Sequence, residues 1–129
     1  MEASDLMFTQ MLQAAEKGNA DAQNRLAGMY LSGTEESKNY EQAVVWLLKA
    51  AEQGHTKAQF NLGIMYAAGK GVAQDFKLAY AWGSVAAING GDSNAAHFRD
   101  AIAHEIFTPA TLADAQALAE QLTMKHRQY

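Results

Sequence analysis

Apolar side chains recur along this chain at the spacing of amphipathic helices. Ala58, Leu62 and Tyr66 lie at i, i+4 and i+8, which places them on one face of a helix. A second apolar face begins at Phe76 and includes Trp82. The same periodicity along the whole sequence predicts seven helices, at residues 4–17, 21–32, 40–53, 57–68, 75–89, 93–105 and 109–126.

The chain also repeats itself with a period of 36 residues. An Ala-Ala-x-x-Gly sequence occurs at residues 14–18, 50–54 and 86–90. The residues matched at this spacing are Ala22, Leu26 and Tyr30 with Ala58, Leu62 and Tyr66, and Tyr40, Ala43 and Trp46 with Phe76, Ala79 and Trp82. A helix pair cannot bury its apolar face alone, so neighbouring units are expected to stack.

Turn and capping residues mark the ends of these helices. Asn39 and Asp75 stand where an N-cap side chain can accept a free amide hydrogen. Residues 69–72 form a glycine-containing turn, and Gly54 and Gly90 are expected just past the ends of the second helices.

The last helix has the pattern of a terminal cap. It begins at Thr108-Pro109, with threonine as N-cap and proline in the first turn. Its apolar stripe consists of Leu112, Ala115, Leu118, Ala119 and Leu122, and its other face of Asp114, Gln116, Glu120 and Gln121. One apolar and one polar face suit a helix that closes a stack of repeats.

The repeat unit resembles the Sel-one-like repeat (SLR) family, a relative of the tetratricopeptide repeats. The matching pattern of one unit runs from its first helix into its second and consists of Ala58, Leu62, Gly63, Tyr66, Gly69, Gly71, Val72, Asp75, Ala79 and Trp82. The matching residues of the second helix are Ala43, Trp46, Lys49, Ala50, Ala51 and Gly54. The resemblance covers roughly residues 12 to 98. It implies an all-α fold, a right-handed α/α superhelix (solenoid) of about three helix-turn-helix repeats plus a C-terminal capping helix. It also implies an adaptor or scaffold role, common in bacteria, and no catalytic residue.

Some positions depart from the family pattern. Ala27 stands in place of the glycine seen at Gly63, and Glu35-Glu36 in place of Gly71-Val72. Asn94 and Phe98 stand where alanine and leucine are expected at the 36-residue spacing. We therefore expect a single domain over residues 1–129, with repeats at 20–55 and 56–91, a degenerate repeat at 92–105 and a capping helix at 108–126.

Composition excludes several classes of function. The 129 residues are 49% hydrophobic and 19% charged, with a net charge of −4 and no cysteine. This excludes disulfides and thiolate metal sites, and the lack of a basic stripe argues against nucleic acid as a partner. The sequence has no apolar run long enough for membrane insertion and no visible signal peptide. A cytoplasmic location is favoured, with a periplasmic or secreted one open if the chain is part of a longer protein.

Candidate chemical sites are weak. His97, Asp100 and His104 lie at i, i+3 and i+7, a spacing that metal ligands can have, but a solvated helix face is the favoured interpretation. The turn at 69–71 lacks the strand and the Gly-Lys-Ser/Thr of a phosphate-binding loop. We predict neither an enzyme nor a cofactor or metal.

The favoured hypothesis is a non-catalytic protein- or peptide-binding adaptor that uses the concave groove of the solenoid. If the geometry follows the tetratricopeptide pattern, the first helices line this groove, with Asn24, Lys57, Phe60, Asn61 and Ile64 as partner-binding residues. Phe60 and Ile64 either face the groove or pack against a neighbouring helix. The alternative is a structural or self-associating repeat protein, a homo-oligomer with no separate ligand. A small enzyme or metal-binding protein is a third hypothesis.

Overall fold

A computed structural model describes residues 3–32 and 39–127. Within these ranges the chain forms seven helices and no strand, as the periodicity predicts. They are α1 (Ala3–Glu16), α2 (Ala20–Leu31), α3 (Tyr40–Glu52), α4 (Thr56–Ala68), α5 (Phe76–Gly90), α6 (Ser93–Glu105) and α7 (Pro109–Lys125). The Glu35-Glu36 departure lies outside the described residues.

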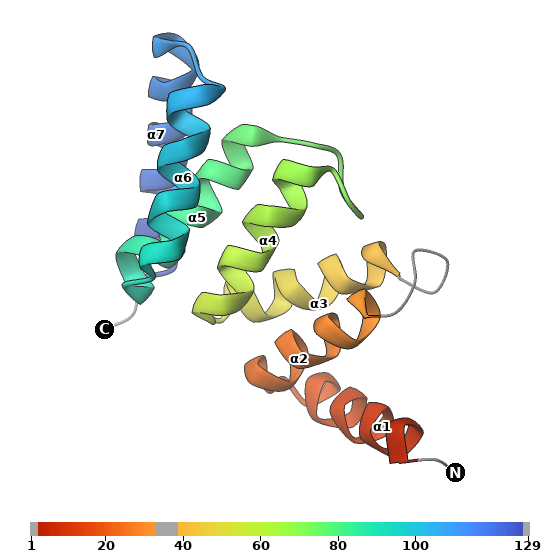
Figure 1. Ribbon diagram of the computed structural model, residues 1–129. Coiled ribbons are helices and arrows are strands. Elements are labelled where there is room, and N and C mark those ends of the chain that lie inside the picture. Colours follow the sequence, from red (N-terminus) through yellow and green to blue (C-terminus); the bar gives the residue numbers. More distant parts are fainter. Residues whose placement is uncertain (1–2, 33–38, 128–129) are drawn as a thin grey trace.

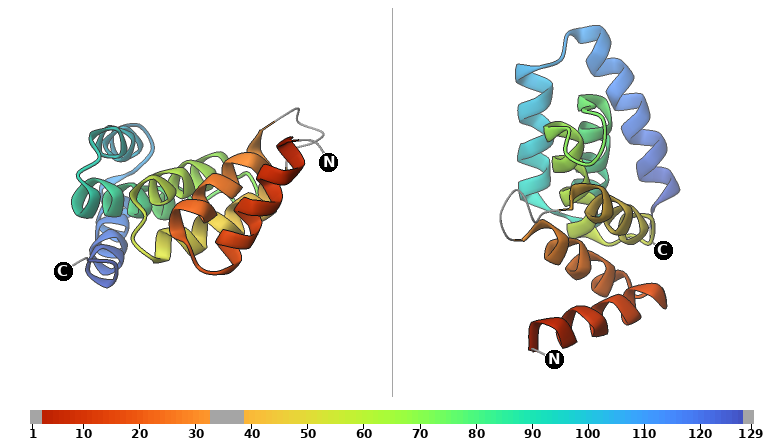
Figure 2. Two further views of the ribbon diagram at one scale, coloured as in Figure 1. Left: turned by 90° about the horizontal axis from the view of Figure 1, so that it is seen from below. Right: turned by 90° about the vertical axis from the view of Figure 1, so that its right-hand side faces the viewer.

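The helices stack in chain order, from α1–α2 at one end of the molecule to α6–α7 at the other (Figure 1). Each helix from α1 to α5 packs against the next one in the chain, and α5 also packs against α6 and α7. The two last helices flank α5 and meet near their connecting turn (Figure 2). This stack of helix pairs is the solenoid that the repeat predicts.

The core follows the apolar stripes. One cluster includes Leu47, Leu62, Trp82 and Val85, with Tyr66 partly buried against it. A second lies between α5, α6 and α7, where the capping stripe of α7 packs on α5 and α6. The polar face of α7 is exposed. The repeated aromatic residues are thus packing residues: Trp82 is 5% exposed, and Tyr30, Trp46, Tyr66 and Phe76 pack against the buried clusters.

Side-chain caps begin six of the helices. The predicted caps are confirmed, because Asn39 accepts from the amide of Gln42, Asp75 from that of Leu78, and Thr108 from that of Thr111. Three further caps, which we did not predict, start the first helices of the units. They are Asn19, His55 and Asp92, which accept from Ala22, Ala58 and Ala95.

These caps correct the register of the third unit. Asn19 and His55 are 36 residues apart, but His55 and Asp92 are 37 apart. The prediction that Gly90 ends α5 is wrong: the helix includes Gly90 and ends on Gly91, which has a φ of +67°. The 36-residue spacing therefore breaks by one residue. Ala95, fully buried, is the counterpart of Ala58, and the expected alanine is present after all.

At two positions a neighbouring part of the chain approaches the backbone so closely that only glycine fits. A Cβ at Gly90 would overlap the side chain of Thr56 at the start of α4. A Cβ at Gly71, which has a φ of +75°, would overlap the carbonyl of Tyr40 at the start of α3. The turn at 69–72 is thus part of the contact between two repeats.

Buried glutamines also connect the repeats. Gln23 Nε2 donates to the carbonyl of Ala15 at 3.0 Å, and Gln59 Nε2 donates to that of Ala51 at 3.1 Å. Gln23 Oε1 accepts from Gln53 Nε2 at 2.9 Å. Gln59 Oε1 is buried and has no hydrogen-bond partner among the described residues.

Among the described residues, Gln59 lacks the hydrogen-bond donor that Gln23 has because the residue corresponding to Gln53 is different in the second repeat. Asn89, 36 residues after Gln53, has a shorter side chain and donates to the carbonyl of Thr123 on α7 at 3.0 Å. In the second repeat, the Asn89 side-chain amide therefore binds the capping helix α7 and not the oxygen of Gln59.

Candidate functional site

The predicted partner-binding residues of α4 form one stripe. Lys57, Phe60, Asn61 and Ile64 lie at i, i+3, i+4 and i+7, away from the buried side of the helix. Lys57 is exposed, Ile64 is 41% exposed, and Phe60 and Asn61 are half-buried. We call the surface formed by α2, α4 and α6 the first-helix face.

An amide pair joins α2 to α4 on this face. Asn61 Nδ2 donates to Asn24 Oδ1 at 3.4 Å, a long hydrogen bond between successive repeats. Beside it, His55 Nε2 lies 3.4 Å from Asp21 Oδ1. Asn24 Nδ2 and Asn61 Oδ1 make no other hydrogen bond among the described residues. The structure thus brings two of the predicted residues together and leaves one donor and one acceptor available.

An aromatic pair joins α4 to α6. The rings of Phe60 and Phe98 are 5.5 Å apart between centroids and inclined at 59°. Gly63, one turn along α4, lies beside them, because a Cβ there would be 3.4 Å from the Phe98 ring and 3.1 Å from the Ala79 carbonyl oxygen. Phe60 packs on a neighbouring helix and remains half-buried, whereas Ile64 next to it is exposed.

Sequence reasoning missed Phe98 as a member of this surface. We interpreted it as a failed leucine position, because the 36-residue spacing pairs it with Leu62. In the corrected register Phe98 is the counterpart of Asn61, and Arg99 that of Leu62. The signal was available in Asp92, whose capping position fixes the start of α6.

The stripe on α4 lies apart from the cavity of about 400 Å³ between α5, α6 and α7. The half-buried and exposed side chains of this stripe form an accessible surface. An open surface with apolar and amide groups can contact an extended chain along its length, whereas small ligands are enclosed in concave pockets.

Titratable groups show little that is arranged for catalysis. Burial raises the pKa of the Tyr66 phenol, and the nearby Asp75 carboxylate raises it further. His97 and His104 are exposed, and Asp100 accepts from Arg99 Nε at 3.0 Å. The described residues include no group of three potential metal ligands. Within the same ranges, no helix is both long and apolar enough to span a bilayer.

Solved structures share this architecture. One is a protective antigen present in uropathogenic Escherichia coli strains that displays an SLR fold. It is 34% identical, with a TM-score of 0.85 over 92% of this chain and 25% of that one. A Sel1 repeat protein from Oxalobacter formigenes is 27% identical, with a TM-score of 0.67 over 92% of this chain and 33% of that one. This chain therefore spans a quarter to a third of the length of these relatives.

The family comparison concerns the two regular repeats. No curated protein sequence matches the chain at a significant level. The sequence profile of the Sel1 repeat matches residues 20–55 and 56–91, which together make up more than half of the chain. Proteins of this family are generally helical repeat scaffolds for protein interaction and are generally non-catalytic. With two matched repeats, their shared caps and the helix-pair stacking, the chain belongs to the Sel1 repeat family.

Proposed function

We propose that this chain is a non-catalytic protein- or peptide-binding module, and that its first-helix face holds an extended segment of a partner protein. The observation that carries the proposal is the stripe on α4. Its exposed Ile64 lies one turn from the half-buried Phe60, and the Asn24–Asn61 pair lies beside them. Apolar side chains beside amide groups that have a donor and an acceptor still available suit a peptide in extended conformation.

The amide pair suits recognition of a peptide backbone. An extended peptide presents carbonyl oxygens and amide hydrogens that lose water when it binds, and each needs a new partner. Asn24 Nδ2 can donate to such a carbonyl, and Asn61 Oδ1 can accept from such an amide. Because these contacts involve the main chain, they would provide affinity with little dependence on the partner's sequence.

The neighbouring residues would provide selectivity. Ile64 and the Phe60–Phe98 pair form an apolar contact surface for one or two side chains of the partner. Lys57 is exposed at the start of the same stripe and makes no ion pair among the described residues. We therefore expect a partner segment with an apolar residue near an acidic one.

The experiment uses a random-peptide display library selected against the whole chain. Kd is then measured for a selected peptide with wild type, Ile64→Ser, Asn61→Ala and the control Val45→Ser. Val45 is a matched control because it is a β-branched residue of α3 with 44% exposure, close to the 41% of Ile64. We expect a loss of affinity of about tenfold or more in the first two variants, equivalent to about 1.4 kcal/mol, and none in the control.

Phe60→Ala separates binding from packing. Since Phe60 is half-buried, we expect a loss of stability of about 1–2 kcal/mol together with weaker peptide binding. A loss of about 3–5 kcal/mol, typical of a core phenylalanine, would remove Phe60 from the binding surface. Light scattering of the same samples tests the self-association hypothesis. If wild type is an oligomer that Ile64→Ser dissociates, the face binds a second copy instead.

A further inference from the structure

We infer that the groove between α5, α6 and α7 is a second binding site, and that it takes a small amphipathic carboxylate. Its volume is about 400 Å³, within the range of small-molecule pockets. The proposal is independent of the first-helix face, because none of the partner-binding residues named above lines this groove.

The groove exists because the last two helices diverge. Both α6 and α7 pack on α5 (Figure 2), and residues of α5 line the groove between them. Tyr80, Ser84 and Ile88 lie at i, i+4 and i+8 and form a strip along α5. Ile88 is 60% exposed, and Met124 on the α7 wall is also 60% exposed. These apolar side chains would cover the hydrocarbon part of a ligand.

The charged side chains that line the groove indicate which end group a ligand would carry. The lining includes the cations Arg99 and Arg127 and one carboxylate, Glu120. Arg99 Nε contacts Asp100 at 3.0 Å, while Arg127 and Glu120 make no ion pair among the described residues. Glu120 lies five residues, about 7.5 Å, before the end of α7 at Lys125, and Arg127 follows beyond that end. A ligand carboxylate near Arg127 is therefore well removed from Glu120, and a guanidinium can bind it in bidentate fashion.

The groove is also long enough for such a ligand. Its α7 wall runs from Gln116 to Met124, a rise of about 12 Å along the helix axis, and Arg127 lies just beyond the end of α7. An apolar chain on the strip of α5, with its acid group at the Arg127 end, would use both the length and the polarity of the site. A neutral apolar ligand would gain no contact from the Arg127 guanidinium.

The test measures binding of decanoate and of decanol to the full chain by calorimetry. The variants are Arg127→Gln, Glu120→Gln, Ile88→Asp and Ile88→Lys, with Val45→Asp as a control outside the groove. We expect decanoate to bind more tightly than decanol. Its Kd should rise about tenfold in Arg127→Gln, fall in Glu120→Gln, and rise more in Ile88→Asp than in Ile88→Lys. All of these residues are exposed, and circular dichroism verifies that each variant is folded.

Three results would overturn the proposal. Equal affinity for decanol and decanoate would show an apolar groove without anion selection. Decanoate binding that Val45→Asp weakens as much as Ile88→Asp does would place the ligand elsewhere. An absence of saturable binding up to millimolar decanoate would mean that the groove has no ligand of this class.

Discussion

The two buried glutamines provide a comparison inside one molecule. Gln23 and Gln59 occupy the same position of successive repeats, are 4% and 1% exposed, and donate to equivalent carbonyls. They differ at their oxygen, because Gln23 Oε1 accepts from Gln53 and Gln59 Oε1 has no partner among the described residues. We predict that replacement by methionine, which has a similar shape and no amide, affects stability differently at the two sites.

The magnitudes follow from counting hydrogen bonds. The carbonyls of Ala15 and Ala51 each keep a second donor, the amides of Gly18 and Gly54, so neither becomes unpaired in a variant. Gln23→Met removes two hydrogen bonds of about 1 kcal/mol each and should cost about 2 kcal/mol. Gln59→Met removes one such bond but also an unsatisfied buried oxygen, whose desolvation costs about 1–3 kcal/mol. Its net effect should lie between neutral and a stabilisation of about 2 kcal/mol.

Urea unfolding monitored by circular dichroism measures both variants against wild type. A difference of at least about 2 kcal/mol in unfolding free energy, with Gln23→Met the less stable, is the expected result. If the m-values are equal and Gln59→Met costs as much as Gln23→Met, the Gln59 oxygen is satisfied in solution, for example by a buried water molecule. That outcome would refute the explanation based on Asn89.

Three further predictions concern the scaffold. Leu62→Asp should destabilise the fold by about 3–5 kcal/mol in thermal unfolding, because Leu62 is fully buried and the carboxylate would have no partner. Removal of residues 109–129 should cause aggregation, seen by light scattering, since α7 covers an apolar face of α5; a soluble monomer of native helicity would contradict this role. A pH titration of tyrosine absorbance should show Tyr66 ionising above its usual pKa, with Asp75→Asn reducing the shift only partly because burial is its larger cause. Since the pKa is raised in the folded state, stability should be unaffected below about pH 10 and decrease as pH rises above it.

Helix positions and core faces could be predicted because they depend on local periodicity. The stripe of Leu62 and the caps at Asn39 and Asp75 need only the sequence of one helix and its turn. The third unit was aligned wrongly because one extra residue, Gly91, changes the spacing without changing the helical pattern on either side. A period extended by counting cannot detect such an insertion, whereas the capping position of Asp92 can.

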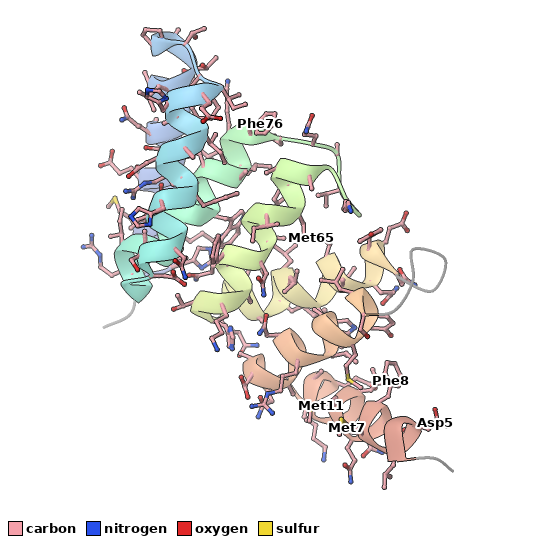
Figure 3. The ribbon with its side chains drawn as sticks, in the orientation of Figure 1. Asp5, Met7, Phe8, Met11, Met65 and Phe76 are labelled. Carbon is pink, nitrogen blue, oxygen red and sulfur yellow. The ribbon has the colours of Figure 1, made fainter. Side chains whose placement is uncertain are left out.

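Contacts between repeats could not be predicted from the sequence for a different reason. A polar residue such as Gln23 or Gln59 is expected on a helix surface, and its burial depends on how closely the preceding repeat approaches. The burial of apolar residues on α1 likewise depends on how closely a neighbouring helix approaches. Phe8 packs edge-on against Tyr30, and Met11 lies beside Phe8 (Figure 3). Met7, on the same helix, is 56% exposed. The recurrence of glutamine at positions 36 apart was the available signal.

Comparison of the two regular repeats separates scaffold from surface. Five buried or partly buried positions are identical in α2 and α4: Ala22 and Ala58, Gln23 and Gln59, Leu26 and Leu62, Met29 and Met65, and Tyr30 and Tyr66. All four positions of the outward stripe differ: Asp21 and Lys57, Asn24 and Phe60, Arg25 and Asn61, and Gly28 and Ile64. Packing accounts for the first set in the two regular repeats, while the second set is free to differ between them. The first-helix face is polar on α2, where Arg25 and Asp21 pair at 3.1 Å, whereas on α4 it carries the apolar side chains of Phe60 and Ile64 beside Lys57 and Asn61. If this face binds a peptide as proposed, the peptide should bind in one direction, with its apolar residues over α4 and its polar residues over α2. A spin label at either end of a selected peptide would test this, because only one label should broaden the resonances of α2.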